Sequence, residues 1–121
     1  LRELGQKYRK PVNLGTVPPQ DWDAIASHGF DAVWLMGIWE RSPAGIEISM
    51  RNQGLLEDFR RALPDFSAED NVGSPYCVRR YVVDQRLGGP EALQRARADL
   101  QRHGLRLVLD WVPNHVSPDI R

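Results

Sequence analysis

Arg-His-Gly-Leu-Arg-Leu-Val-Leu-Asp, residues 102–110, is the stretch that decides the fold class. A glycine that follows a helical pattern is a usual helix end, and the largely apolar run after it is typical of a buried strand. The same arrangement occurs earlier, where His28-Gly29 precedes the apolar run Ala32–Trp39. A helix that ends in His-Gly and leads into a buried strand, found twice, predicts a parallel α/β sheet.

The other elements follow from these two units. We expect a short strand over Pro11–Gly15, a helix that begins at Pro18-Pro19, and a strand over Ala32–Trp39. A second helix begins at Gly89-Pro90, and the third strand is Leu105–Asp110. This order predicts about three parallel strands joined by two crossover helices, each crossover being right-handed.

A long segment, from about Glu40 to Gly88, separates the second strand from the second helix. Leu55, Leu56, Phe59 and Leu63 fit one short amphipathic helix, and Ser67–Asp70 fits a capped turn. The segment is too long for an ordinary connection, and insertions of this kind often carry function.

The composition limits the function. Lys and Arg together number 16, as do Asp and Glu, so the formal net charge is zero. This balance gives no support to a nucleic-acid binder or to an electrostatic membrane partner. Cys77 is the single cysteine, which excludes an intramolecular disulfide. No apolar run approaches the ~20 residues that span a bilayer.

The polar residues of interest lie after the third strand. Asp110, Asn114 and His115 follow it closely, and parallel α/β folds bind ligands at the carboxyl ends of their strands. Taken alone, Asp110 is also a residue that caps a turn, and a lone histidine is usually a packed or exposed one. Trp34 is expected in the core, and Glu40-Arg41 suggests an internal salt bridge more than a substrate contact.

The stretch Asp110-Trp111-Val112-Pro113-Asn114-His115 resembles the first conserved region of the α-amylase family of glycoside hydrolases. Residues 74–89, with Tyr76, a second tyrosine, Val-Asp and a glycine, resemble that family's segment before the second barrel helix. The resemblance covers about residues 19 to 119. It implies that residues 1–121 are an N-terminal fragment of a (β/α)8 catalytic domain, a partial TIM barrel.

The resemblance also implies site residues. Asp110 would hydrogen-bond within the catalytic centre, His115 would donate to a sugar hydroxyl, and Tyr76 would offer its ring to that sugar. Asn114 would supply one oxygen to a calcium ion in those members that bind one, and calcium takes 6–8 such ligands. The parent would be a retaining α-glycosidase or transglycosidase that acts on α-glucosidic bonds of oligosaccharides or glucans.

The catalytic carboxylates of that family lie on later strands, so the chain alone is expected to be inactive. An incomplete barrel leaves a strand edge unpaired, which predicts pairing with the remainder of the barrel or with another copy of the chain. Two alternatives stay open: a partial barrel that binds carbohydrate without cleaving it, and a structural α/β domain in which the motif is accidental.

Overall fold

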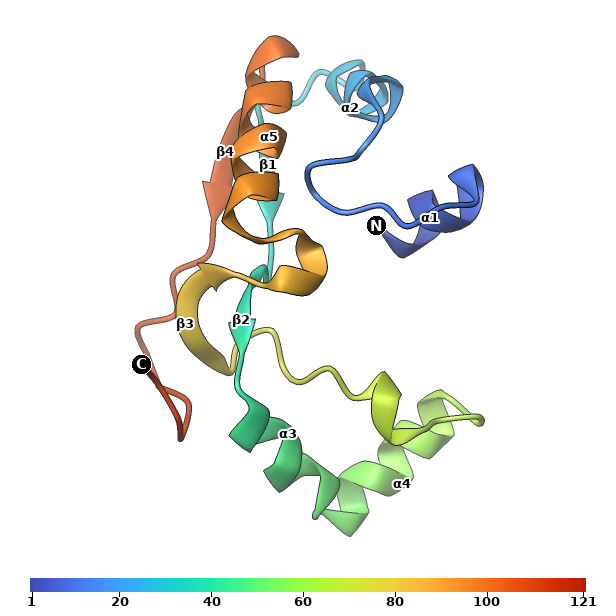
Figure 1. The fold of residues 1–121 in the computed structure, drawn as a ribbon, viewed down its shortest axis with the longest axis vertical. Coiled ribbons are helices and arrows are strands. Elements are labelled where there is room, and N and C mark those ends of the chain that lie inside the picture. Colours follow the sequence, from blue (N-terminus) through green and yellow to red (C-terminus); the bar gives the residue numbers. More distant parts are fainter. The chain divides into compact units, whose positions relative to one another are not determined.

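The computed structural model describes residues 1–121, and the chain divides into two compact units, which we treat separately. The first unit comprises Leu1–Ile38 and Val82–Trp111, and the second comprises Trp39–Tyr81 and Val112–Arg121. The first contains the helices α1 (Arg2–Tyr8), α2 (Pro19–Ala26) and α5 (Gly89–Arg102), the short helix η2 (Gln85–Leu87), and the strands β1 (Ala32–Leu35) and β4 (Arg106–Leu109) (Figure 1). The second contains β2 (Trp39–Arg41), α3 (Pro43–Met50), α4 (Gln53–Ala62), the short helix η1 (Ala68–Asp70) and most of β3 (Val78–Val83).

The fold is mixed α/β, as the sequence predicts. Strands β1 and β4 pair in parallel, in a register that joins Ala32 to Arg106 and Leu35 to Leu109. Strands β2 and β3 form a second, antiparallel pair. The structure contains no closed barrel, so the predicted partial TIM barrel is not confirmed.

Helix α5 forms the core of the first unit. Ala92, Ala96 and Leu100 recur every four residues and are all buried, because one face of the helix packs against β4 and α2. Gly104, with φ of 72°, ends the helical region and leads into β4. Gly29, with φ of 81°, takes the same position between α2 and β1. The repeated His-Gly arrangement is therefore present in the structure.

The strand predicted over Pro11–Gly15 does not form. Asn13 builds a turn instead: its side-chain oxygen accepts from the Gly15 amide at 2.8 Å, and its carbonyl accepts from the Thr16 amide at 3.2 Å. A short side chain that bonds to its own backbone competes with a strand ladder, which is why the prediction was wrong. Leu14 is nevertheless buried, and its amide donates to the Leu87 carbonyl at 3.0 Å.

The predicted single strand Ala32–Trp39 is two strands. β1 ends at Leu35 and β2 begins at Trp39, and Gly37 between them has φ of 63°. This left-handed conformation breaks an extended run and suits glycine. The long segment after it also has more regular structure than predicted, because α3 and β3 form in addition to α4.

One face of the parallel pair is left uncovered. Trp34 is 57% exposed and Val108, its partner in the register, is 46% exposed. The prediction that Trp34 lies in the core was wrong, because the unit contains no layer that covers this face. Separately, none of the helices has both the length and the apolar character needed to cross a membrane.

Candidate functional site

Asp110 lies directly after β4, and its carboxylate is held by two neutral donors. One oxygen, Oδ1, accepts from the Trp34 indole Nε1 at 2.6 Å. The other, Oδ2, accepts from the Gly37 amide at 2.9 Å. Trp34 lies in β1 and Gly37 follows it by two residues, so this side chain connects the carboxyl ends of the two parallel strands.

The register of the sheet explains this geometry. Leu35 faces Leu109, so the residues that follow each strand meet at the same edge. The left-handed backbone of Gly37 turns the chain beyond β1, and its amide donates to the carboxylate of Asp110. Trp34 reaches the same carboxylate from within the strand. The sequence predicts Asp110 at a strand end but gives no signal for either of its donors.

Tyr76 and His115, both in the second unit, are in direct contact. Nε2 of His115 lies 2.8 Å from the carbonyl oxygen of Tyr76. A carbonyl oxygen only accepts, so Nε2 must carry the hydrogen of this bond. Both side chains are exposed, and the Tyr76 amide donates to the Ser74 hydroxyl at 3.2 Å. The predicted residues Tyr76 and His115 are thus brought together through the main chain of Tyr76.

Asn114 is exposed, beside His115 in the sequence. The structure gathers no group of three or more His, Cys, Asp or Glu side chains that could hold a metal ion. Asparagine is not one of these four residue types. This absence therefore does not test the calcium contact predicted for Asn114, which stays a prediction.

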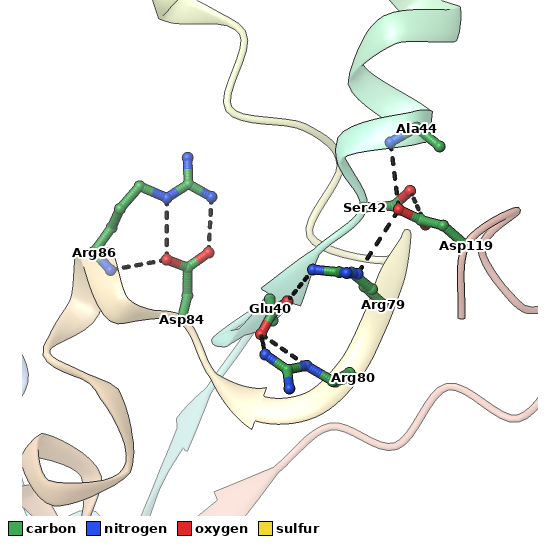
Figure 2. A network of polar contacts seen from close by, with 8 residues as sticks. All are labelled: Glu40, Ser42, Ala44, Arg79, Arg80, Asp84, Arg86 and Asp119. Carbon is green, nitrogen blue, oxygen red and sulfur yellow. Dashed lines mark hydrogen bonds and ion pairs between the residues drawn. The ribbon is translucent and has the colours of Figure 1, made fainter. Parts of the chain in front are cut away.

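The segment Val112–Arg121 is bonded to β3 and to the N-terminus of α3 by contacts that the sequence does not reveal. The Tyr81 hydroxyl accepts from the Val112 amide at 2.9 Å and donates to the Val112 carbonyl at 3.2 Å. The Arg121 amide donates to the Arg79 carbonyl at 3.0 Å. Asp119 accepts from the Ser42 hydroxyl at 2.5 Å (Figure 2). These bonds order the segment that carries Asn114 and His115.

Charged side chains connect β2 to β3, the strand to which the segment Val112–Arg121 is bonded (Figure 2). Glu40 accepts from Arg79 Nη1 at 2.9 Å through one oxygen and from Arg80 Nε at 3.1 Å through the other. Hydrogen bonding from Arg80, and secondarily from Arg79, holds the pKa of Glu40 below its ordinary value. The internal ion pair predicted at Glu40 is present, although its partners are Arg79 and Arg80 and not Arg41.

Asp119 is held mainly by neutral donors, and its Oδ2 also lies 3.9 Å from Arg79 Nε (Figure 2). The hydroxyl of Ser42 is the largest cause that lowers the pKa of Asp119, and the Ala44 amide at 3.5 Å adds to it. Ser42 also caps α3, because its hydroxyl oxygen accepts from the Gly45 amide at 2.9 Å. Asp119 therefore lies at the N-terminus of α3, where a negative charge is favoured.

In the first unit, Asp84 plays a comparable local role. Its carboxylate accepts from the Arg86 amide at 2.8 Å and from Arg86 Nη2 at 2.7 Å (Figure 2). The hydrogen bonding of the Arg86 guanidinium to Asp84 is also the largest cause that raises the pKa of Arg86. This contact begins η2, which leads into α5.

Comparisons with known proteins give a different functional indication from the sequence motif. No family model and no solved structure matches the chain. The lipoprotein-releasing system ATP-binding protein LolD of Pseudomonas fluorescens is 37% identical over 90 residues, which cover 71% of this chain and 37% of that protein. LolD of Pseudomonas syringae pv. tomato matches with the same identity and coverage. The chain spans little more than a third of the length of these relatives.

These matches contradict the resemblance to the α-amylase family. The predicted glycosidase or transglycosidase activity, the carbohydrate-binding alternative and the oligosaccharide partner were therefore wrong. The physical reason is that both matched stretches, residues 74–89 and Asp110–His115, follow patterns of local elements that do not specify one function. An apolar strand followed by an aspartate at its carboxyl end occurs in several classes of parallel α/β protein, including proteins that bind nucleotides. The chain is similar to part of an ATP-binding protein, at a coverage that does not establish its family.

Proposed function

We propose that the chain is one segment of a larger parallel α/β domain and that its ligand-binding end lies where β1 and β4 finish. The observation that carries this proposal is the position of Asp110, whose two oxygens accept from Trp34 and Gly37. Ligands of parallel α/β folds bind beyond the carboxyl ends of the strands, often where such a side chain shapes the edge. Asp110 acts here as a positioning residue.

More specifically, we propose that the larger parallel α/β domain is a barrel. In a closed barrel, one face of each parallel strand meets the interior and the other meets a layer of helices. Trp34 and Val108 supply large apolar side chains for an interior face, and α5 supplies helical cover. The proposal rests on two strands, because Pro11–Gly15 forms a turn.

Tyr76 and His115 are proposed as ligand contacts of the second unit. Since Nε2 of His115 donates to the Tyr76 carbonyl, Nδ1 is the ring nitrogen that can accept from a ligand in the neutral tautomer. The exposed Tyr76 ring offers an apolar surface beside it. We also propose that Asn114 contributes a ligand to a calcium ion. A calcium titration that monitors the side-chain amide resonance of Asn114 would test this proposal.

ATP is a second candidate ligand, and the similarity to the two LolD proteins is the observation that favours it. The residues present do not fit its phosphates, however. The loop that cradles nucleotide phosphates reads Gly-x-x-x-x-Gly-Lys-Ser/Thr, and no Gly-Lys pair occurs in the 121 residues. We therefore assign no step of nucleotide chemistry to this chain.

Nuclear magnetic resonance of the labelled chain tests the strand-end proposal. Isopropanol is a suitable mapping probe because it has one hydroxyl and an apolar body. We expect its saturable shifts to concentrate on the Trp34 indole and the Gly37 amide, and to disappear in Asp110→Ala. Asp31→Ala is the matched control, since Asp31 precedes the opposite end of β1. Shifts that survive in Asp110→Ala would overturn the proposal.

The same samples test the nucleotide. If the chain contributes to an ATP site, MgATP shifts the Trp34 and Gly37 resonances in the unsubstituted chain and in Asp31→Ala but not in Asp110→Ala. No shift at saturating MgATP rejects the nucleotide for this chain and leaves the isopropanol result to decide the strand-end proposal.

A further inference from the structure

The second unit contains a pocket whose lining does not include Asp110, Tyr76 or His115. It has a volume of about 430 Å³ and lies between α3, α4 and the chain that leads from η1 to β3. Leu55 and Phe59 of α4 line it from one side, and Phe66, Val72 and Cys77 line it elsewhere. The rings of Phe59 and Phe66 are 5.2 Å apart and tilted by 41°. The lining is mainly apolar and aromatic.

The polar side chains at its border are bonded to one another and to the backbone. Asn71 Nδ2 donates to the Ser49 hydroxyl at 2.8 Å, and Ser49 donates to the Ile46 carbonyl at 2.8 Å. The Asn71 carbonyl oxygen accepts from the Gly73 amide at 3.2 Å. Because these groups already have partners, a charged or strongly polar ligand would find little compensation for its lost hydration.

Asp70 does not change this conclusion. Its carboxylate accepts from the Ser67 amide at 2.8 Å and from the Ser67 hydroxyl at 3.2 Å, which forms the capping box of η1. The one ionisable carboxylate on the lining is thus part of a local turn. A cationic ligand would have to displace these bonds.

The size of the pocket sets the size of the ligand. Small-molecule sites fall at roughly 300–1,000 Å³ and are mostly apolar with a few polar groups. An apolar cavity of about 150 Å³ holds one benzene ring. A volume of about 430 Å³ therefore suits two or three fused or linked rings, or an aliphatic body of similar bulk.

We propose that this pocket, formed by Leu55, Phe59, Phe66, Val72 and Cys77, binds an uncharged, mainly apolar small molecule of two to three rings. The proposal is independent of the strand-end proposal, because every residue in it belongs to the second unit and none is Asp110, Tyr76 or His115.

N-phenyl-1-naphthylamine is an uncharged, three-ring fluorescent probe of this size. We expect one probe molecule to bind per chain, with saturable fluorescence. Phe59→Ala and Leu55→Ala should each weaken binding by on the order of tenfold, the effect of losing about 1.4 kcal/mol of apolar contact. Leu63→Ala is the matched control: Leu55 is 39% exposed and Leu63 is 41% exposed, but Leu63 does not line the pocket.

Cys77 gives a second measurement that needs no substitution. It is the single cysteine, it is half-buried, and it lines the pocket. Saturating probe should slow its alkylation by iodoacetamide several-fold. An unchanged alkylation rate, more than one probe molecule per chain, or equal weakening in Leu63→Ala and Leu55→Ala would overturn the proposal, since each places the probe on exposed apolar surface.

Discussion

Ser42 shows how much one small side chain can determine. It is 1% exposed, it caps α3 through the Gly45 amide, and it donates to the carboxylate of Asp119. The cap has a local signal, because Ser42 precedes Pro43, a residue suited to the first helical turn, although α3 was not predicted. The bond to Asp119 has no such signal, because 77 positions separate the two residues.

Replacement of Ser42 by Ala should lower the free energy of unfolding by about 2 kcal/mol. Loss of the cap contributes about 1 kcal/mol, and loss of the buried bond to Asp119 contributes about 1 kcal/mol more. Asn52→Ala is the control, because Asn52 caps α4 at an exposed site and should cost about 1 kcal/mol or less. Urea denaturation measures both, and equal losses would contradict a stabilising role for the Asp119 bond.

Among the elements, β2 and β3 are held together by charge as well as by their pairing. Glu40 of β2 bonds to Arg79 and Arg80 of β3, and its pKa is lowered chiefly by Arg80. Protons therefore bind Glu40 more weakly in the folded chain than in the unfolded one.

This difference predicts a direction for the pH dependence. A carboxyl group whose folded pKa is depressed stabilises the fold above its ordinary value, near 4.5 for Glu40, and loses this contribution as pH falls through the folded pKa. Melting curves should show stability falling below about pH 4.5, with a smaller fall in Glu40→Gln. Glu57→Gln removes the same charge from exposed α4 and should keep the original slope. Parallel curves for all three chains would refute this role of Glu40.

Helix α5 is the element on which the first unit depends most. Leu100 is 0% exposed, and its replacement by Ala should cost about 2–5 kcal/mol, because a cavity is left in a packed core. Leu93→Ala, on the same helix at a half-buried position, should cost clearly less. Chemical denaturation distinguishes the two, and similar losses would show that α5 does not pack as described.

At the scale of the whole molecule, the parallel pair is the feature that bears on the proposal of a larger domain. Two strands with large apolar side chains exposed on one face form an unprotected sheet, and such surfaces associate.

We therefore expect the chain to self-associate at micromolar concentrations. Val108→Lys should shift sedimentation towards the monomer, because it places a charge on the exposed face of β4. Val116→Lys makes the same change at another exposed valine, in the second unit, and should leave association unchanged. A monodisperse, monomeric chain that melts cooperatively would contradict the incomplete-domain proposal.

The sequence predicted the elements that depend on local pattern. Helix α5 follows from its apolar spacing and from Gly104, and the capped turn at η1 follows from Ser67 and Asp70. The prediction of a strand at Pro11–Gly15 was wrong, because the side chain of Asn13 bonds to the backbone of Gly15 and forms a turn that competes with extended structure. The function inferred from Asp110–His115 and residues 74–89 was wrong, because patterns of strands and strand ends are shared by proteins of unrelated function.

By itself the sequence determined the α/β class, the His-Gly ends of α2 and α5, and the position of Asp110 directly after an apolar strand, because each depends on neighbouring residues. Only the tertiary structure decided that Asp110 meets Trp34 and Gly37, that Asp119 meets Ser42, and that Phe59 and Phe66 border one pocket. These contacts join residues distant in sequence, and their partners are set by packing and strand register, which no local pattern encodes.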